Sequence, residues 1–217
     1  MDSAVLRRTK ARPPPAFDPE AEYPAVIGCD EVGRGALCGP VMVAAVWFDP
    51  ARFPGALLAR LDDSKRLDPA EREALTPLIR AHARLALAAG SRALVDRINV
   101  RAATLDAMRR AVLRLGLDAP VLVDGRDGVP GLDQTCRAIV GGDRLVPQIA
   151  AASIVAKTVR DALMHRLAAR HPAYGWERNA GYGTRLHLDG LARLGRSPHH
   201  RVSFTGRYEG VSEQGEL

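Results

Sequence analysis

The sequence predicts a mixed α/β fold, in which a single sheet carries helices on its faces. Short apolar segments with the character of buried strands come first, and helical segments then alternate with further short strands. This order of elements is typical of a mixed sheet flanked by helices. No internal repeat is visible, and a length of 217 residues fits one domain, or one domain with a small appendage.

The first strands are expected near the start of the chain. Residues 25–29 and 41–48 are apolar, and the short connection between them, broken by Gly39-Pro40, suggests an antiparallel pair. Residues 84–89 are a third candidate, although their Leu and Ala content leaves strand and helix both open. Two further short strands are expected at residues 120–125 and 137–140.

Helix signals are clearest where a cap and a hydrophobic period coincide. Asp68 suits an N-cap, Pro69 suits the first turn, and Glu71 follows three residues after the cap. Gly116 is a typical residue to end a helix whose apolar positions recur at helical spacing. Helices are therefore expected at residues 68–82, 100–115, 147–171 and 186–194.

Composition narrows the class of protein. The net charge of +6 and the pI of about 9.7 favour a polyanionic partner, above all nucleic acid, although a modest positive excess is common. No apolar run approaches the ~20 residues of a membrane helix. Three cysteines without C-x-x-C spacing argue against a disulfide scaffold or a zinc site, and they predict a reducing, cytoplasmic location.

Acidic residues stand at the ends of three apolar segments, and they are Asp30 with Glu31, Asp124, and Asp143. Strand ends in such a sheet commonly share one edge, so these carboxylates are expected to converge there. Oxygen ligands without His or Cys select Mg²⁺ or Mn²⁺, and two such ions ~3.5–4 Å apart promote in-line attack on a phosphodiester. Each acid taken alone is also compatible with a solvated turn.

Two polar segments have the character of phosphate or sugar contacts. Gly33, Arg34 and Gly35 follow the acid pair, and glycines let backbone N–H groups approach a ligand closely. A plain hairpin turn is the alternative. Ser64 and Lys65 precede a predicted helix, where a hydroxyl and a cation could hold a phosphate or simply belong to a solvated loop.

Three further groups of residues each allow two interpretations. Ser153 and Lys157 share one helix face, so Lys157 either points at a charged target or pairs weakly with Asp161, for about 0.3 kcal/mol. Tyr182 lies between two glycines and either stacks on a sugar or base or packs against the body of the protein. Residues 199–201 lack metal-ligand spacing and are either basic surface or structural packing.

Together these motifs closely resemble the type 2 ribonucleases H, specifically the ribonuclease HII family. The matching segments occur in the family's order, at residues 28–35, 63–67, 123–125, 142–143 running into 149–157 with 160–161, 181–184 with 187, and 200–204. The resemblance implies a ribonuclease H-like fold at residues 21–170 and a substrate-contacting helical extension at 171–206. A disordered Pro/Arg-rich arm at 1–20 and a flexible tail at 207–217 lie outside the shared pattern.

The resemblance also implies an activity. A member of this family hydrolyses the RNA strand of RNA–DNA hybrids and cuts on the 5′ side of ribonucleotides embedded in duplex DNA. The products carry 5′-phosphate and 3′-hydroxyl ends, and the implied cofactors are two Mg²⁺ or Mn²⁺ ions. The enzyme is expected to act as a monomer.

Site roles transfer motif by motif. The catalytic metal ligands would be Asp30, Glu31, Asp124 and Asp143. The Gly33–Gly35 segment would read the ribose 2′-OH, the feature that separates RNA from DNA. The remaining expected substrate contacts are Ser64, Lys65, Ser153, Lys157 and Tyr182. One departure is Gly183, where many members have proline, which would loosen the loop that carries Tyr182.

Two other hypotheses remain open from the sequence. A non-catalytic basic protein that binds structured nucleic acid needs only the charge, and it would show steep salt dependence without turnover. It leaves the four acids unexplained. A different two-metal phosphodiesterase of the same superfamily would share the acids, but the Gly-Arg-Gly segment directly after them counts against it.

Overall fold

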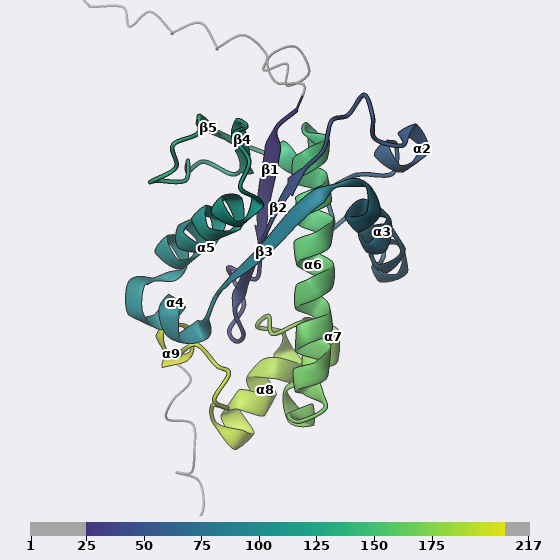
Figure 1. The fold of residues 1–217 in the computed structure, drawn as a ribbon. Coiled ribbons are helices and arrows are strands. Elements are labelled where there is room, and N and C mark those ends of the chain that lie inside the picture. Colours follow the sequence, from purple (N-terminus) through teal and green to yellow (C-terminus); the bar gives the residue numbers. More distant parts are fainter. Residues whose placement is uncertain (1–24, 207–217) are drawn as a thin grey trace, which may run out of the picture.

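The computed structural model describes residues 25–206, and the expected arm at 1–20 and tail at 207–217 lie outside this range. Within it, a five-stranded sheet has the order β3-β2-β1-β4-β5 (Figure 1). The strands are β1 Ile27–Val32, β2 Val41–Trp47, β3 Arg84–Gly90, β4 Val121–Asp124 and β5 Cys136–Ile139. The predicted mixed sheet flanked by helices is therefore confirmed.

The sheet changes direction at its central strand. β1 pairs antiparallel with β2, which pairs antiparallel with β3, whereas β1 pairs parallel with β4 and β4 with β5. The expected antiparallel pair is confirmed, and residues 84–89 form a strand. The predicted end of the first strand at Cys29 is wrong, because pairing with β2 continues to Val32. Asp30 and Glu31 therefore lie within the strand.

The helices occupy most of the remaining described chain. They are α2 Gly55–Leu58, α3 Pro69–His82, α4 Arg92–Ile98, α5 Val100–Leu115, α6 Pro147–Ala168, α7 Trp176–Asn179, α8 Arg185–Leu194 and α9 Val202–Thr205. Short 3-10 turns lie at η1 Gly142–Arg144 and η2 Pro172–Tyr174. In residues 25–206 no helix combines the length and apolar character needed to cross a membrane.

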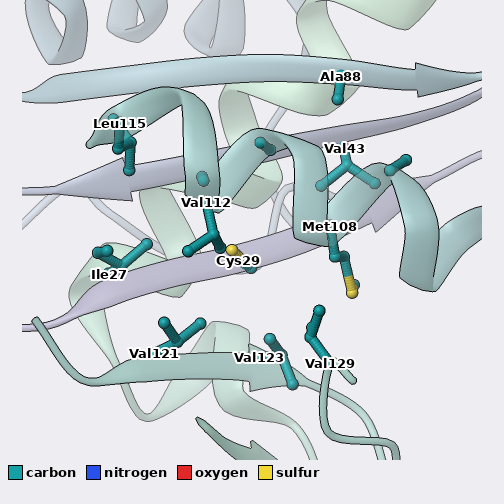
Figure 2. Close-up of a cluster of buried hydrophobic side chains, with 13 residues drawn as sticks. Ile27, Cys29, Val43, Ala88, Met108, Val112, Leu115, Val121, Val123 and Val129 are labelled. Carbon is teal, nitrogen blue, oxygen red and sulfur yellow. The ribbon is translucent and has the colours of Figure 1, made fainter. Parts of the chain in front are cut away.

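Two long helices cover the two faces of the sheet (Figure 1). On one face, Met108, Val112 and Leu115 of α5 pack against Cys29 and Val43 of the central strands (Figure 2). The opposite face of the sheet is covered by α6, which also packs against α3. Burying apolar groups on both faces stabilises the sheet by ~25 cal/mol per Å² of apolar surface.

Gly28 allows α6 to approach β1 closely. A Cβ at this position would overlap the backbone of Gln148 and Ile149 at the start of α6. Because no larger residue fits, the helix lies directly on the strand. This close approach brings the polar residues of α6 to the part of β1 that carries Asp30.

Candidate active site

The two acids of β1 point to opposite faces of the sheet. Cys29 packs in the core on the α5 side, whereas Gly28 faces the backbone of α6. Successive side chains of a strand alternate between faces. Asp30 therefore faces α6, where it forms a hydrogen bond with the side chain of Ser153, and Glu31 faces α5.

The parallel pairing of β1 with β4 brings a third acid beside the first. The register aligns Cys29 with Val123, so the next residues along the two strands are Asp30 and Asp124. Asp124 in turn accepts a hydrogen bond from the backbone N–H of Gly142, with Oδ1 at 2.8 Å. This bond ties η1, which contains Asp143, to the end of β4. The structure thus gathers all four expected acids at one end of the sheet.

Burial makes ionisation of these acids costly. Asp30 is only 6% exposed, and this burial raises its pKa well above the usual range, with the charges of Glu31 and Asp124 adding to the effect. Burial also raises the pKa of Asp143, and Asp124 adds to it. For Glu31 burial raises the pKa, while Arg34, whose Nη1 lies 3.3 Å from Oε1, opposes the rise.

The donor set fits a hard divalent cation. Carboxylate oxygens are the ligands that Mg²⁺ and Mn²⁺ prefer, and a cation would offset the repulsion that raises these pKa values. Within the described range, no three of these carboxylates bring oxygens within 4.8 Å of one another. Around a shared ion these carboxylates would lie closer together than they do here.

Asp63 is a fifth acid at this site, and the sequence reasoning missed it. Its side chain forms a hydrogen bond with Asp143, and its charge helps to raise the pKa of that residue. Its own Oδ1 accepts from the backbone N–H of Lys65 at 3.0 Å. From the sequence, Asp63 is explained equally well as a residue of a solvated loop or a cap, and the structure gives the cap of α3 to Asp68.

The residues expected to contact substrate phosphates differ in their exposure and in their partners. Lys65 is exposed, and its charge partly opposes the rise in pKa that burial causes at Glu31 and Asp143. The hydroxyls of Ser64 and Ser153 are buried and lie 2.8 Å apart, linking the loop before α3 to α6. Lys157 contacts Asp161 one helical turn further on, with Nζ 2.9 Å from Oδ1.

The Gly33–Gly35 segment forms a tight loop beside the acids. Gly33 has a φ of +89°, a conformation that side chains disfavour, and a Cβ there would overlap the guanidinium of Arg160. Gly35 has open space around it. Arg34 is held over the site by its ion pair with Glu31. Arg34 and Gly35 are exposed beside the carboxylates, whereas Gly33 is buried and its carbonyl accepts from the guanidinium of Arg201.

Tyr182 lies in the loop between α7 and α8 and is half-buried. The guanidinium of Arg160 lies 5.5 Å from the centroid of its ring. Two contacts join this loop to the residues after Gly35: the N–H of Leu37 donates to the carbonyl of Gly181 at 2.8 Å, and a Cβ at Gly183 would lie 3.2 Å from Leu37. The Tyr182 loop and the segment after the glycine loop thus lie side by side.

Two residues of the 199–201 segment are structural. His200 and Arg201 are at most 1% exposed, so of the two interpretations left open, packing is the one observed. His187, the family-motif residue of α8, is also fully buried. The chain thus places these residues beneath the loops that carry Tyr182 and Gly33 rather than on a basic surface.

The chain is similar in sequence to known proteins. A sequence model of the ribonuclease HII family matches residues 27–207. The ribonuclease HII of Paramagnetospirillum magneticum is 57% identical over 180 residues, which cover 82% of this chain and 89% of that protein. The ribonuclease HII of Chlorobium luteolum is 47% identical over 195 residues, covering 87% and 92%.

Solved structures resemble the fold. The ribonuclease H2 of Pyrococcus horikoshii aligns with a TM-score of 0.72 at 22% identity, covering 85% of this chain and 97% of that one. A Bst ribonuclease HIII in complex with Mn²⁺ aligns with a TM-score of 0.68 at 21% identity, covering 90% and 70%.

Proposed function

This chain belongs to the ribonuclease HII family, whose members are metal-dependent endoribonucleases acting on RNA–DNA hybrids, and from that premise we propose that it also cuts duplex DNA 5′ of single embedded ribonucleotides. One observation carries the proposal. The ion pair of Arg34 with Glu31 sets the Gly33–Gly35 loop directly against the acidic site. A group that reads the 2′-OH and a group that cuts the adjacent phosphodiester are needed side by side for this reaction.

We assign the metal site to Asp30, Glu31, Asp124 and Asp143, binding Mg²⁺ or Mn²⁺, with two ions in the catalytic state. When bound, such ions lower the pKa of water and neutralise charge that develops on phosphate oxygens. The raised pKa values of Asp30 and Asp143 support the assignment, because burial and neighbouring carboxylates disfavour their charged forms and a bound cation would offset both effects. The Mn²⁺ complex of the Bst ribonuclease HIII is consistent with it.

The other site residues bind and orient the substrate in this proposal. Backbone groups of Gly33 and Gly35 contact the ribose 2′-OH, and Lys65 contacts a phosphate beside the acids. The ring of Tyr182 packs on the sugar at the RNA–DNA junction. A water oxygen forms the new bond to phosphorus as the bond to the 3′-oxygen breaks, which leaves a 3′-hydroxyl and a 5′-phosphate.

We also propose a cellular location and an oligomeric state for the enzyme. All three cysteines of the chain are free thiols, which supports a reducing, cytoplasmic location. We further propose that the chain acts as a monomer. Family membership assigns an enzyme, so it argues against the hypothesis of a non-catalytic nucleic-acid-binding protein.

Cleavage of two matched duplexes tests the proposal. One 5′-labelled duplex carries a single ribonucleotide and its twin is all DNA, and each is incubated with Mg²⁺, with Mn²⁺ and with a chelator. We expect a single cut on the 5′ side of the ribonucleotide that needs a metal, and no cut in the twin. Equal cutting of both duplexes would indicate a different nuclease with a similar metal site.

Asp124→Asn tests the assignment of the acids. Asparagine keeps an oxygen that can accept the bond from Gly142, so the fold should persist by circular dichroism. The lost charge should lower the cleavage rate on the order of 10²–10³-fold, because metal-ion stabilisation of the transition state supplies several kcal/mol. Turnover equal to the unmodified protein would remove Asp124 from the catalytic site.

A further inference from the structure

Two buried histidines contact each other beneath the Tyr182 loop and the Gly33–Gly35 loop. His187 comes from α8 and His200 from the segment before α9, and their Nε2 atoms lie 3.0 Å apart. With Cys38 they form, among residues 25–206, the only group of three potential metal ligands within 4.8 Å of one another. The cluster is therefore either a metal site or a hydrogen-bonded element of the fold.

The partners of each ring nitrogen determine where its hydrogen lies. Nδ1 of His187 lies 2.9 Å from the carbonyl oxygen of Tyr182, which can only accept, so this Nδ1 carries a hydrogen. Nδ1 of His200 accepts from the backbone N–H of Ser197 at 2.9 Å, so its hydrogen is on Nε2. His200 therefore donates to Nε2 of His187, which also accepts from Nε1 of Trp176 at 3.0 Å.

This assignment uses every ring nitrogen with both histidines neutral. No lone pair is left for a metal ion, and burial raises the pKa of the Cys38 thiol to about 12, so it is not a thiolate. Burial also lowers the pKa of both histidines, in agreement with their neutral forms. The cluster is a directed chain of hydrogen bonds from Ser197 through His200 and His187 to the Tyr182 carbonyl.

The same chain of hydrogen bonds lies where three segments of the protein meet. Cys38 forms an isolated β-bridge with His200. The backbone N–H of Gly39 donates to the carbonyl of His199 at 2.9 Å, and the backbone N–H of Arg201 donates to the carbonyl of Leu37 at 2.8 Å. Residues 37–39 follow the glycine loop after one intervening residue, Ala36. The histidine pair thus links the backbone that carries Tyr182 to the backbone that follows Gly33–Gly35.

We propose that His187 and His200 are positioning residues for substrate recognition, which fix the Tyr182 loop relative to the Gly33–Gly35 loop through the bond to the Tyr182 carbonyl. This inference rests on the proposed cleavage at embedded ribonucleotides. Neither histidine touches substrate. Their effect is to hold the ring that packs on the sugar at a set distance from the groups that read the 2′-OH.

Two substitutions of His187 separate its bond to Tyr182 from its contacts with His200 and Trp176. In His187→Asn the side-chain N–H replaces that of Nδ1, so the bond to Tyr182 can be kept while the contact with His200 is lost. In His187→Gln the amide reaches the place of Nε2, so the contacts with His200 and Trp176 can be kept while the bond to Tyr182 is lost. We expect kcat/KM on the single-ribonucleotide duplex to be about fivefold or more lower for His187→Gln than for His187→Asn.

If His187 had only a structural role, the kcat/KM values of the two variants would follow their thermal stabilities instead. Melting temperatures of both variants are therefore measured alongside cleavage. A cycle with Tyr182→Ala completes the test, because the His187→Gln effect should largely vanish when the tyrosine ring is absent. The same cycle with His200→Gln addresses the second histidine if either His187 variant fails to fold.

The outcomes separate the two proposals. If the unmodified protein does not cut the single-ribonucleotide duplex, the proposed function fails. If it does cut, but His187→Gln matches His187→Asn or acts independently of Tyr182, the positioning role is overturned while the proposed function stands.

Discussion

Arg160 and Arg201 are fully buried, and their guanidinium groups donate to backbone carbonyls. Arg160 bonds the carbonyls of Pro40, Ala180 and Cys38 at 2.8–3.2 Å, and Arg201 bonds those of Gly39, Arg34 and Gly33 at 2.8–3.0 Å. Burial lowers the pKa of both, that of Arg201 to about 10. The planar fork of arginine suits several fixed acceptors at once, so these two residues shape the glycine loop rather than contact nucleic acid.

Arg160→Lys tests this role. The ammonium of lysine lacks the wide planar fork of the guanidinium and cannot reach all three carbonyls, so one or more bonds to a charged donor are lost. We expect a loss of about 2–4 kcal/mol in the free energy of unfolding, measured by urea denaturation. Arg160→Met should cost at least as much, because it leaves all three acceptors unpaired. A loss below about 1 kcal/mol for both variants would contradict this role.

Local sequence was informative about the acids and uninformative about these arginines. Asp30 and Asp124 stand out because a carboxylate at the end of an apolar strand needs an explanation. For Arg201 the sequence left basic surface and structural packing both open, because its burial depends on carbonyls more than 160 residues earlier in the chain. Asp63 was missed for the opposite reason, since its neighbours already supplied a local explanation.

The short helix α9 begins at a cap that comes from another helix. Asp96 of α4 accepts hydrogen bonds from the backbone N–H of Val202 at 3.1 Å and of Ser203 at 3.0 Å, and from the Ser203 hydroxyl at 2.7 Å. A helix of four residues is not stable by itself. Asp96 therefore fastens the C-terminal segment of the described chain to the main body.

Asp96→Ala should destabilise the protein by about 1–2 kcal/mol, because three donors lose their acceptor. Asp96→Asn keeps an acceptor oxygen and should cost less. The hydrogen bonds from Ser203 and Val202 lower the pKa of Asp96 in the folded state against the opposing effect of burial. The carboxylate therefore stabilises the fold above the unfolded-state pKa, and this stabilisation is lost as the pH falls through the lower folded-state pKa.

Urea denaturation of the three proteins at pH 7 and near pH 3 measures both effects. The gap between the unmodified protein and Asp96→Ala should narrow at the lower pH. A gap that is the same at both pH values would show that the charge of Asp96 contributes nothing to the cap.

Helices that combine a local cap with a hydrophobic period were predictable, and elements defined by tertiary pairing were not. The helix α3 begins as expected, with Asp68 accepting from Glu71, and α5 ends before Gly116 in a left-handed conformation. The seven-residue α4 was missed, because its one clear signal is the Ser91 cap. The identity of β3 as a strand is decided by pairing with β2 along its whole length, which the sequence does not display.

A cluster of rings joins the C-terminal helices to the rest of the molecule. Tyr174 stacks on Trp176 with ring centroids 5.1 Å apart, and the Tyr174 ring lies 4.8 Å from that of His200. The other members are His171, His187 and His199. The cluster packs with Met164 of α6 and with Cys38. Protonation of its histidines therefore changes the free energy of unfolding of the whole protein.

The protein should therefore lose stability in mildly acidic solution. Burial lowers the pKa of His200 to about 4, and the neighbouring His187, His171 and His199 add to the effect. In the unfolded chain a histidine takes up its proton near pH 6.5. Between these values the unfolded state binds more protons than the folded state, so the free energy of unfolding falls as the pH decreases, by up to ~1.4 kcal/mol per pH unit for one histidine.

Comparing the unmodified protein with His200→Gln isolates this contribution. Urea denaturation at pH 7.5, 6.5, 5.5 and 5.0 gives the free energy of unfolding of each at every pH. The variant should be less stable at pH 7.5, because it disturbs the bonds to Ser197 and His187, but its stability should fall less steeply below pH 6.5. Parallel slopes for the two proteins would mean that His200 takes up its proton equally well in the folded state, which its complete burial and its neutral hydrogen-bond chain both oppose.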